Sequence, residues 1–307
     1  MFSLLHRNPL SSLDPLSSLD VELAPLRIPL KEIYTATQDF SDENLIKRGE
    51  NADVYRGVLP LRSKVGMDVV IRRYRISQLP LILTFYEEIK RINSCLKHKN
   101  IVSLVGYCDE KGEKMIVMEH VVNGRMEKYL SNQLTWAQRL HICFGASLAF
   151  NTINPHAAVK SFKIYLDEDW EAKVVFCFDL LVEYSYTKHS NEYCFGMMLL
   201  EMLYGRKTTV KDVNHYLAKM VTNVHYEEGQ LDDIIDPNLR KQMRPETLST
   251  FSEIACKCLK KHKYHWQRPG MLHIVERLKK AFEMQWRHEN HVRALMRLKS
   301  CVAYNAL

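Results

Sequence analysis

The stretch LKHKNIVSLVGYCDEKGEKMIVMEHV, Leu96 to Val121, holds two apolar runs separated by a short charged turn. The runs, IVSLVGYCDE and EKMIVMEHV, are rich in Val, Ile and Met and are short enough for strands. They predict two strands of one sheet.

The residues upstream of this stretch extend the same pattern. ADVYRGVL (52–59) and MDVVIRRY (67–74) predict two more strands, so an antiparallel sheet is expected here. LTFYEEIKRINSCL (83–96) and PLKEIYTATQDF (29–40) carry apolar residues at helical spacing. The first half of the chain is therefore expected to be a sheet with few helices.

The residues downstream are mostly helical in pattern. Five segments carry an apolar stripe at a period of 3.6 residues, and the first and fourth begin at plausible caps: 135–150, 192–203, 213–224, 246–259 and 271–286. A β-rich part followed by a longer helical part predicts a two-lobed α+β fold.

The expected domain boundaries follow from these changes in pattern. Residues 1–25 repeat SSLDPLSSLD without an amphipathic period and are expected to be a flexible leader. We expect a small lobe with a hinge over 26–121, a large lobe over 122–285 and a C-terminal tail over 286–307.

Composition excludes several functional classes. The 307 residues are 46% hydrophobic and 26% charged, and no run of 18 apolar residues occurs, so no membrane span is expected. The net charge of +7 is spread without a basic block, which disfavours nucleic-acid binding. The eight cysteines lack zinc-like spacing and are expected to be reduced core thiols in a cytoplasmic protein.

Several ordered blocks together resemble the protein kinase domain of plant receptor-like and receptor-like cytoplasmic kinases. They are NLIKRGENADVYRGVL, VVIRRY, the block around LKHKNIVSLVGYCDE, LTWAQRLHI, KIYLDEDWEAKV and YCFGMMLLEMLYGRK, and they span about residues 27–285. The resemblance implies a kinase-like fold, and the family relatives are ATP-dependent Ser/Thr protein kinases.

The glycine-rich loop of that family is degenerate in this chain. In KRGENA, Lys47 and Ala52 replace the outer glycines, Gly49 is kept, and Glu50 and Asp53 add negative charge where phosphate would lie. We interpret the segment as an ordinary β-hairpin.

The lysine of the third strand in the family corresponds to Arg72, and its glutamate partner corresponds to Glu88. Arginine can pair with a carboxylate, but its planar fork differs in shape from an ammonium. We interpret the pair as a structural tie between sheet and helix.

The catalytic loop and the metal motif are also altered. His156 is kept and Ala158 replaces the catalytic aspartate; Lys160 is present, Lys163 replaces the metal-binding asparagine, and Phe176 replaces the metal-binding aspartate. Neither alanine nor phenylalanine offers an oxygen for a proton or a magnesium ion. The catalytic machinery is therefore expected to be lost.

The residues around the metal motif predict further changes. Val174 to Phe178 are interpreted as an apolar plug in the emptied cleft, and His156 as a packing residue. The activation segment is largely missing, so Arg268, whose family counterpart pairs with a glutamate of that segment, is expected to have another partner or to face solvent.

A vestigial nucleotide cleft is predicted on residues that match the family pattern: Gly49, Val54, Arg72, Met118, Glu119 and Val121. Binding of ATP and magnesium is expected to be lost, so no cofactor is assigned.

The sequence leaves three hypotheses about function. The preferred one is a pseudokinase that acts as a scaffold, adaptor or decoy in plant receptor-kinase or immune signalling, with kinases, receptors or immune proteins as partners, recruited by them to the plasma membrane or free in the cytoplasm. The alternative is a weak or unconventional Ser/Thr kinase or an ATP-binding switch. A third hypothesis is a decaying duplicate without function.

Overall fold

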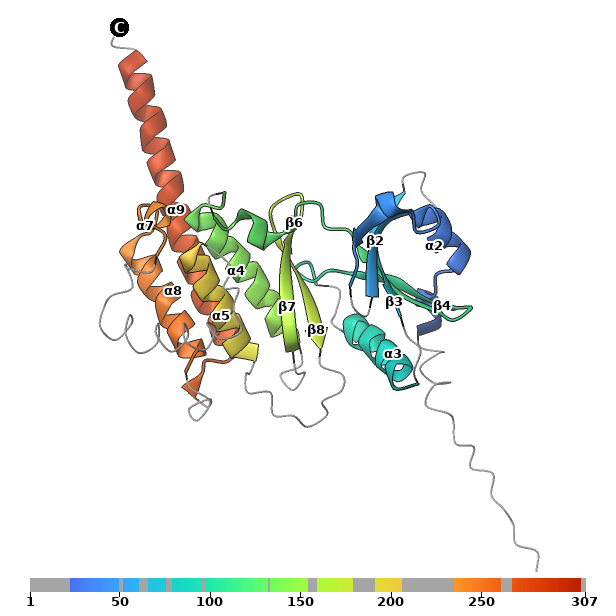
Figure 1. The fold of residues 1–307 in the computed structure, drawn as a ribbon. Helices are drawn as coiled ribbons and strands as arrows, with labels where there is room; N and C mark the ends of the chain where they lie inside the picture. Colours follow the sequence, from blue (N-terminus) through green and yellow to red (C-terminus); the bar gives the residue numbers. More distant parts are fainter. Residues whose placement is uncertain are drawn as a thin grey trace, which may run out of the picture. The chain divides into compact units, whose positions relative to one another are not determined.

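The structure is a computed structural model in which the chain forms two compact units (Figure 1). The first unit runs up to Ser94 and includes Ser103–His120, and the second comprises Cys95–Val102 and the chain from Val121 onward. The described residues are 23–49, 52–60, 66–75, 79–94, 98–131, 133–153, 159–178, 191–205, 235–260 and 267–304.

The first unit contains a five-stranded antiparallel sheet in the order β1-β2-β3-β5-β4. Its strands are β1 (Leu45–Lys47), β2 (Ala52–Leu59), β3 (Met67–Tyr74), β4 (Leu104–Glu110) and β5 (Glu113–Glu119). β2 and β3 coincide with the predicted runs. β4 begins at Leu104, later than expected, because Ile101 instead forms an isolated bridge with Val174 in the second unit.

Two helices cover the two faces of this sheet, α2 (Leu30–Thr37) and α3 (Leu79–Ser94). Met115 and Val117 belong to one buried cluster with residues of α2, whereas Ile116 belongs to another cluster with Phe85 and Ile89 of α3. Successive side chains of a strand point to opposite faces, so the alternation along β5 places the helices on opposite sides.

Three boundaries in the first unit differ from the expected ones. α2 ends at Thr37 instead of residue 40, because Gln38, Asp39 and Phe40 all adopt the left-handed conformation, with φ from 52° to 55°. α3 begins at Leu79 instead of residue 83. Leu23, assigned to the leader, is fully buried beside α3, so packed structure begins before residue 26.

The second unit combines a small sheet with a set of helices. The sheet has the order β6-β7-β8, and the elements are β6 (Gly124–Arg125), α4 (Trp136–Asn151), β7 (Val159–Leu166), β8 (Ala172–Phe178), α5 (Asn191–Tyr204), α7 (Pro237–Arg240), α8 (Pro245–Cys258) and α9 (Met271–Tyr304). Short 3-10 helices lie at Ala24–Leu26, Asp42–Asn44 and Met126–Tyr129. In Figure 1, α4, α5, α8 and α9 lie side by side, in agreement with their contacts.

Four of the five predicted downstream helices are present, and the segment 213–224 lies outside the described residues. The predicted cap of α4 is confirmed, because Thr135 forms a capping box with Gln138. The predicted cap of α8 is wrong: its N-cap, Arg244, makes no side-chain capping bond, and Pro245 begins the helix.

α9 continues through Gln285 to Tyr304, so the boundary expected between residues 285 and 286 falls inside a helix. Gln285 itself is buried and donates to the carbonyl of Gln242 at 2.8 Å. Within the described ranges, no helix has both the length and the apolar character to cross a membrane.

Arg139 of α4 is an unusual member of the core of the second unit, because its side chain is almost fully buried. Its guanidinium donates to the backbone oxygens of Met202 at 2.8 Å and Leu134 at 3.2 Å, and also to that of Leu130. Burial lowers the pKa of Arg139 to about 10. The arginine thus ties α4 to two neighbouring segments.

Candidate functional site

The predicted pair of Arg72 and Glu88 is present in the first unit, where it joins β3 to α3. Arg72 Nη1 lies 3.1 Å from Glu88 Oε1. The same Nη1 donates to the hydroxyl of Tyr74 at 3.1 Å, and that hydroxyl donates to Glu88 Oε2 at 2.9 Å. The three side chains form a closed network that is half-buried or better.

This network accounts for the charge of Glu88 without a ligand. In an active kinase the residue at position 72 would pair with phosphates as well as with the glutamate. Here the fork of Arg72 contacts two neighbours of its own lobe, and burial raises the pKa of the Tyr74 phenol. The arrangement is that of a structural tie.

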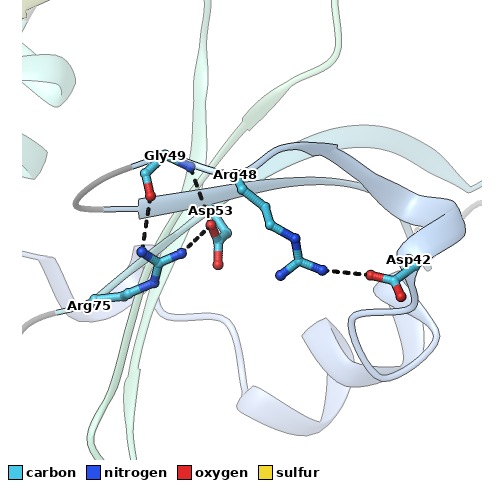
Figure 2. Close-up of polar contacts among 5 residues, drawn as sticks. All are labelled: Asp42, Arg48, Gly49, Asp53 and Arg75. Carbon is cyan, nitrogen blue, oxygen red and sulfur yellow. Dashed lines mark hydrogen bonds and ion pairs between the residues drawn. The ribbon is translucent and has the colours of Figure 1, made fainter.

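A second polar cluster lies at the segment that corresponds to the glycine-rich loop. Figure 2 shows Arg75 reaching both Asp53 and the carbonyl of Gly49. Arg75 Nη2 lies 2.5 Å from Asp53 Oδ1, and Nη1 donates to Gly49 O at 3.0 Å. The amide of Gly49 in turn donates to Asp53 Oδ1 at 3.3 Å. The carbonyl and the amide of Gly49 are therefore both bound by one ion pair.

Gly49 is also required by the path of the chain itself. A Cβ atom at this position would lie 2.5 Å from the carbonyl oxygen of Ala52, which is closer than real Cβ contacts. A side chain at position 49 would collide with the backbone of Ala52, so glycine is needed here whether or not a phosphate approaches. Glu50, between the two residues, lies outside the described part of the chain.

The other residues of the predicted nucleotide cleft are divided between the two units. In the first unit, Val54 of β2 lies opposite Arg72 in the register of β2 and β3, and Met118 and Glu119 end β5. The amide of Glu119 donates to the carbonyl of Ser103 at 3.0 Å. Val121 is buried and belongs to the second unit.

The altered metal positions lie on the hairpin of β7 and β8. Phe176 is opposite Phe162 and Lys163 is opposite Val175, so the two positions are one step apart in the register. Lys160 lies at an irregularity in this pairing. His156 and Ala158 lie outside the described residues, as do the side chains of Lys160 and Phe176.

The backbone of β8 is held firmly by the segment before β4. The amide of Val174 donates to Asn100 O at 2.8 Å, and its carbonyl accepts from the amide of Val102 at 3.0 Å. Val174 is fully buried in the core of this unit. The predicted plug therefore has a buried first residue, while the side chains of residues 176–178 lie outside the described part.

The described carboxylates do not form a cluster that could replace the lost metal ligands. Asp167, at the turn of the hairpin, accepts the amides of Asp169 and Glu171 through Oδ1. Among the residues with described side chains, no group of three or more His, Cys, Asp or Glu could hold a metal ion. Lysine at 163 and phenylalanine at 176 do not fit a magnesium ion, which requires oxygen ligands.

Arg268 has protein partners in place of the glutamate with which its family counterpart pairs. Its Nε and Nη2 donate to the carbonyl of Lys260 at 3.1 and 2.6 Å, and the guanidinium lies 5.2 Å from the ring centroid of Tyr193. Burial lowers the pKa of Arg268.

Sequence reasoning missed two of these residues, Tyr74 and Arg75. Tyr74 could have been found, because residues 72 and 74 share one face of a strand. The contact of Arg75 with Asp53 depends on the register of β2 and β3 and on side-chain rotamers at the strand ends, which the sequence pattern alone does not give.

Comparisons with known proteins agree with the kinase-like pattern of this site. Residues 41–161 match the family described as protein tyrosine and serine/threonine kinase. A probable receptor-like protein kinase of Arabidopsis thaliana is 32% identical over 92% of this chain and 38% of its own length. The chain thus spans well under half of that relative.

Solved structures share the fold of the chain. The apo GRMZM2G135359 pseudokinase has a TM-score of 0.68 at 24% identity, covering 84% of this chain and 94% of its own. The pseudokinase domain of BIR2, an immune regulator of the RLK/Pelle family, has a TM-score of 0.62 at 24% identity, covering 84% and 87%. The predicted α+β kinase-like fold, with a β-sheet N-lobe and a helical C-lobe, is confirmed. The chain contains a protein kinase domain that is homologous to the kinase domains of plant receptor-like kinases.

Proposed function

We propose that this chain is a catalytically inactive kinase-like domain that acts as a scaffold, adaptor or decoy in plant receptor-kinase or immune signalling. Its partners would be other protein kinases, receptors or immune proteins, met in the cytoplasm or at the inner face of the plasma membrane. The pseudokinase BIR2, an immune regulator of similar fold, supports this class of partner.

The observation that carries the proposal is the β7–β8 hairpin. Its backbone pairing is regular through the metal positions, yet these hold Lys163 and Phe176. Phosphoryl transfer depends on positioning and on metal electrostatics, so a cation and a phenyl ring at these positions remove the main source of rate enhancement. Ala158 also removes the general base.

The test of inactivity is phosphoryl transfer by the purified protein. We expect no incorporation of labelled phosphate into the protein or a generic substrate above a buffer blank, with magnesium or manganese present. Metal-dependent incorporation that disappears in Lys160→Ala would overturn the proposal of inactivity.

The scaffold role needs a separate test. Affinity purification from native tissue, followed by identification of the bound proteins, should yield protein kinases or receptors. A matched bait, the kinase domain of an active relative, would show which partners are particular to this chain. Recovery of the same proteins by both baits, or of none, would contradict a dedicated scaffold.

An ATP-binding switch is the second candidate, because Lys160, Glu88 and the hinge segment after Met118 are kept in the sequence. A saturable rise in melting temperature on titration with ATP would support this candidate, because a ligand that binds only the folded state stabilises it. We expect no such rise, with or without a divalent metal.

A further inference from the structure

The ion pair of Asp53 and Arg75 occupies the donors that an anion would use at this loop. Asp53 Oδ1 accepts from the Gly49 amide at 3.3 Å and from Arg75 Nη2 at 2.5 Å (Figure 2). A backbone amide together with a guanidinium is a donor set that suits phosphate oxygens. One carboxylate oxygen therefore accepts from both of these donors.

The carboxylate of Asp53 is largely shielded from solvent, whereas the guanidinium side chain of Arg75 is exposed. The side chain of Asp53 is 13% exposed, against 53% for Arg75. The hydrogen bond from Arg75 is the main cause that lowers the pKa of Asp53, so the group is charged at neutral pH. The negative charge at this point is thus permanent under physiological conditions.

We propose that Asp53 is a built-in anion that fills a latent polyphosphate site formed by the Gly49 amide and the Arg75 guanidinium. This inference deepens the proposed function and rests on it for the assignment of residues 47–52 as the former phosphate loop. The site is closed in the native chain and opens to inorganic triphosphate when the carboxylate is removed.

The neighbouring ion pair provides a matched control. Arg48 Nη2 lies 2.8 Å from Asp42 Oδ1 in the same lobe, and both side chains are exposed. Asp42→Ala releases one guanidinium and changes the net charge by the same amount as Asp53→Ala. It frees no loop amide, so it measures the combined effect of the added charge and of one freed guanidinium on the same loop.

The experiment is calorimetric titration of the full chain with inorganic triphosphate at fixed low ionic strength. We expect Asp53→Ala to bind at least about tenfold tighter than the wild type or Asp42→Ala, the size of one hydrogen bond to a charged group. The double variant Asp53→Ala/Arg75→Ala should return to the wild-type affinity, because it lacks the guanidinium.

Three results would overturn the inference: equal affinity of Asp53→Ala and Asp42→Ala, wild-type binding as tight as that of Asp53→Ala, or a gain that survives removal of Arg75. If Asp53→Ala is poorly folded by its thermal melt, Asp53→Asn keeps the shape and an acceptor oxygen and should show a smaller gain. Phosphoryl transfer is measured in a separate assay, so failure of this inference is distinguishable from failure of the proposed function.

Discussion

The arginine at position 72 shows how one residue can keep a contact while its chemistry changes. An ammonium is a point charge that can turn from a glutamate to a phosphate, whereas a guanidinium presents a fixed planar fork. In this protein the fork of Arg72 contacts both Glu88 and Tyr74, which also bond to each other. The arginine that stands in place of the family's lysine therefore joins β3 to α3 through these hydrogen bonds.

Removal of the Arg72 guanidinium should therefore destabilise the folded protein. We expect Arg72→Ala to lower the free energy of unfolding by about 1–3 kcal/mol, because Glu88 and Tyr74 lose a partner in a partly buried place. Denaturant unfolding would measure the change. Arg48→Ala, which breaks an exposed pair, is the control and should change it by less than about 1 kcal/mol. Equal effects of the two variants would contradict the tie.

The lowered pKa of Asp53 predicts a dependence of stability on acid. A carboxylate with a lower pKa in the folded state contributes stability above its ordinary pKa, and this contribution is lost as the pH falls through the folded pKa. We expect the difference in stability between the wild type and Asp53→Asn to be constant from pH 7 to about 5 and to shrink below the ordinary value near 3.9. Unfolding curves over this range would measure it, and a constant difference down to pH 2.5 would contradict it.

At the scale of elements, the strands were easier to predict than the ends of the helices. β2 and β3 match their predicted ranges because β-branched and aromatic residues recur in both short runs. α2 ends three residues early for a tertiary reason: the ring of Phe40 lies against Tyr34, Tyr55 and the guanidinium of Arg73. Apolar periodicity reports which residues are buried and does not report where a chain turns to bury them.

The candidate site, like the secondary structure, could be predicted only in part from the sequence. The pairing of Arg72 with Glu88 follows from the order of strand and helix in a known fold. The contact of Arg75 with Asp53 crosses from the end of β3 to the start of β2, and it depends on side-chain rotamers at the strand ends.

The β7–β8 hairpin carries a prediction about restoring the metal ligand. We expect Phe176→Asp to leave magnesium–ATP binding undetectable by calorimetry, because Lys163 still brings a cation next to the metal position and Ala158 is unchanged. The variant should also be less stable, because an aspartate would place an unpaired charge in the proposed apolar plug.

The control for this hairpin is Val175→Asp, which introduces the same single negative charge in place of an apolar side chain at a half-buried position of the same strand. It should destabilise less than Phe176→Asp. A well-folded Phe176→Asp variant that binds ATP only with magnesium would show that the cleft is open and that the apolar plug does not exist.

At the scale of the whole molecule, the chain forms two units of different construction. The first is held by an antiparallel sheet with a helix on each face, and the second by helices that pack around Trp136 and Phe251. In the second unit, Arg139 joins the segments that contain Leu130 and Met202 to α4. This unit is therefore expected to unfold as one cooperative body.

Loss of this arginine should destabilise the second unit as a whole. We expect Arg139→Met to cost more than about 3 kcal/mol, because three backbone carbonyls lose a buried charged donor together. Arg287→Met, at an exposed position of α9, is the control and should be nearly neutral. Hydrogen exchange should show increased opening across α4 and α5 in Arg139→Met only, and a change confined to the first turn of α4 would contradict this role.

The close approach of Gly49 to the carbonyl oxygen of Ala52 has a consequence for how kinase sequences are classified. A Cβ at position 49 would collide with the chain's own carbonyl, so natural selection can keep this glycine for the sake of the hairpin alone. A rule that counts loop glycines as a sign of nucleotide binding would credit this protein with a feature that its geometry explains without a nucleotide. Classification should instead rely on positions whose side chains serve only catalysis. Substitution of such a residue is better evidence that the protein has lost the reaction.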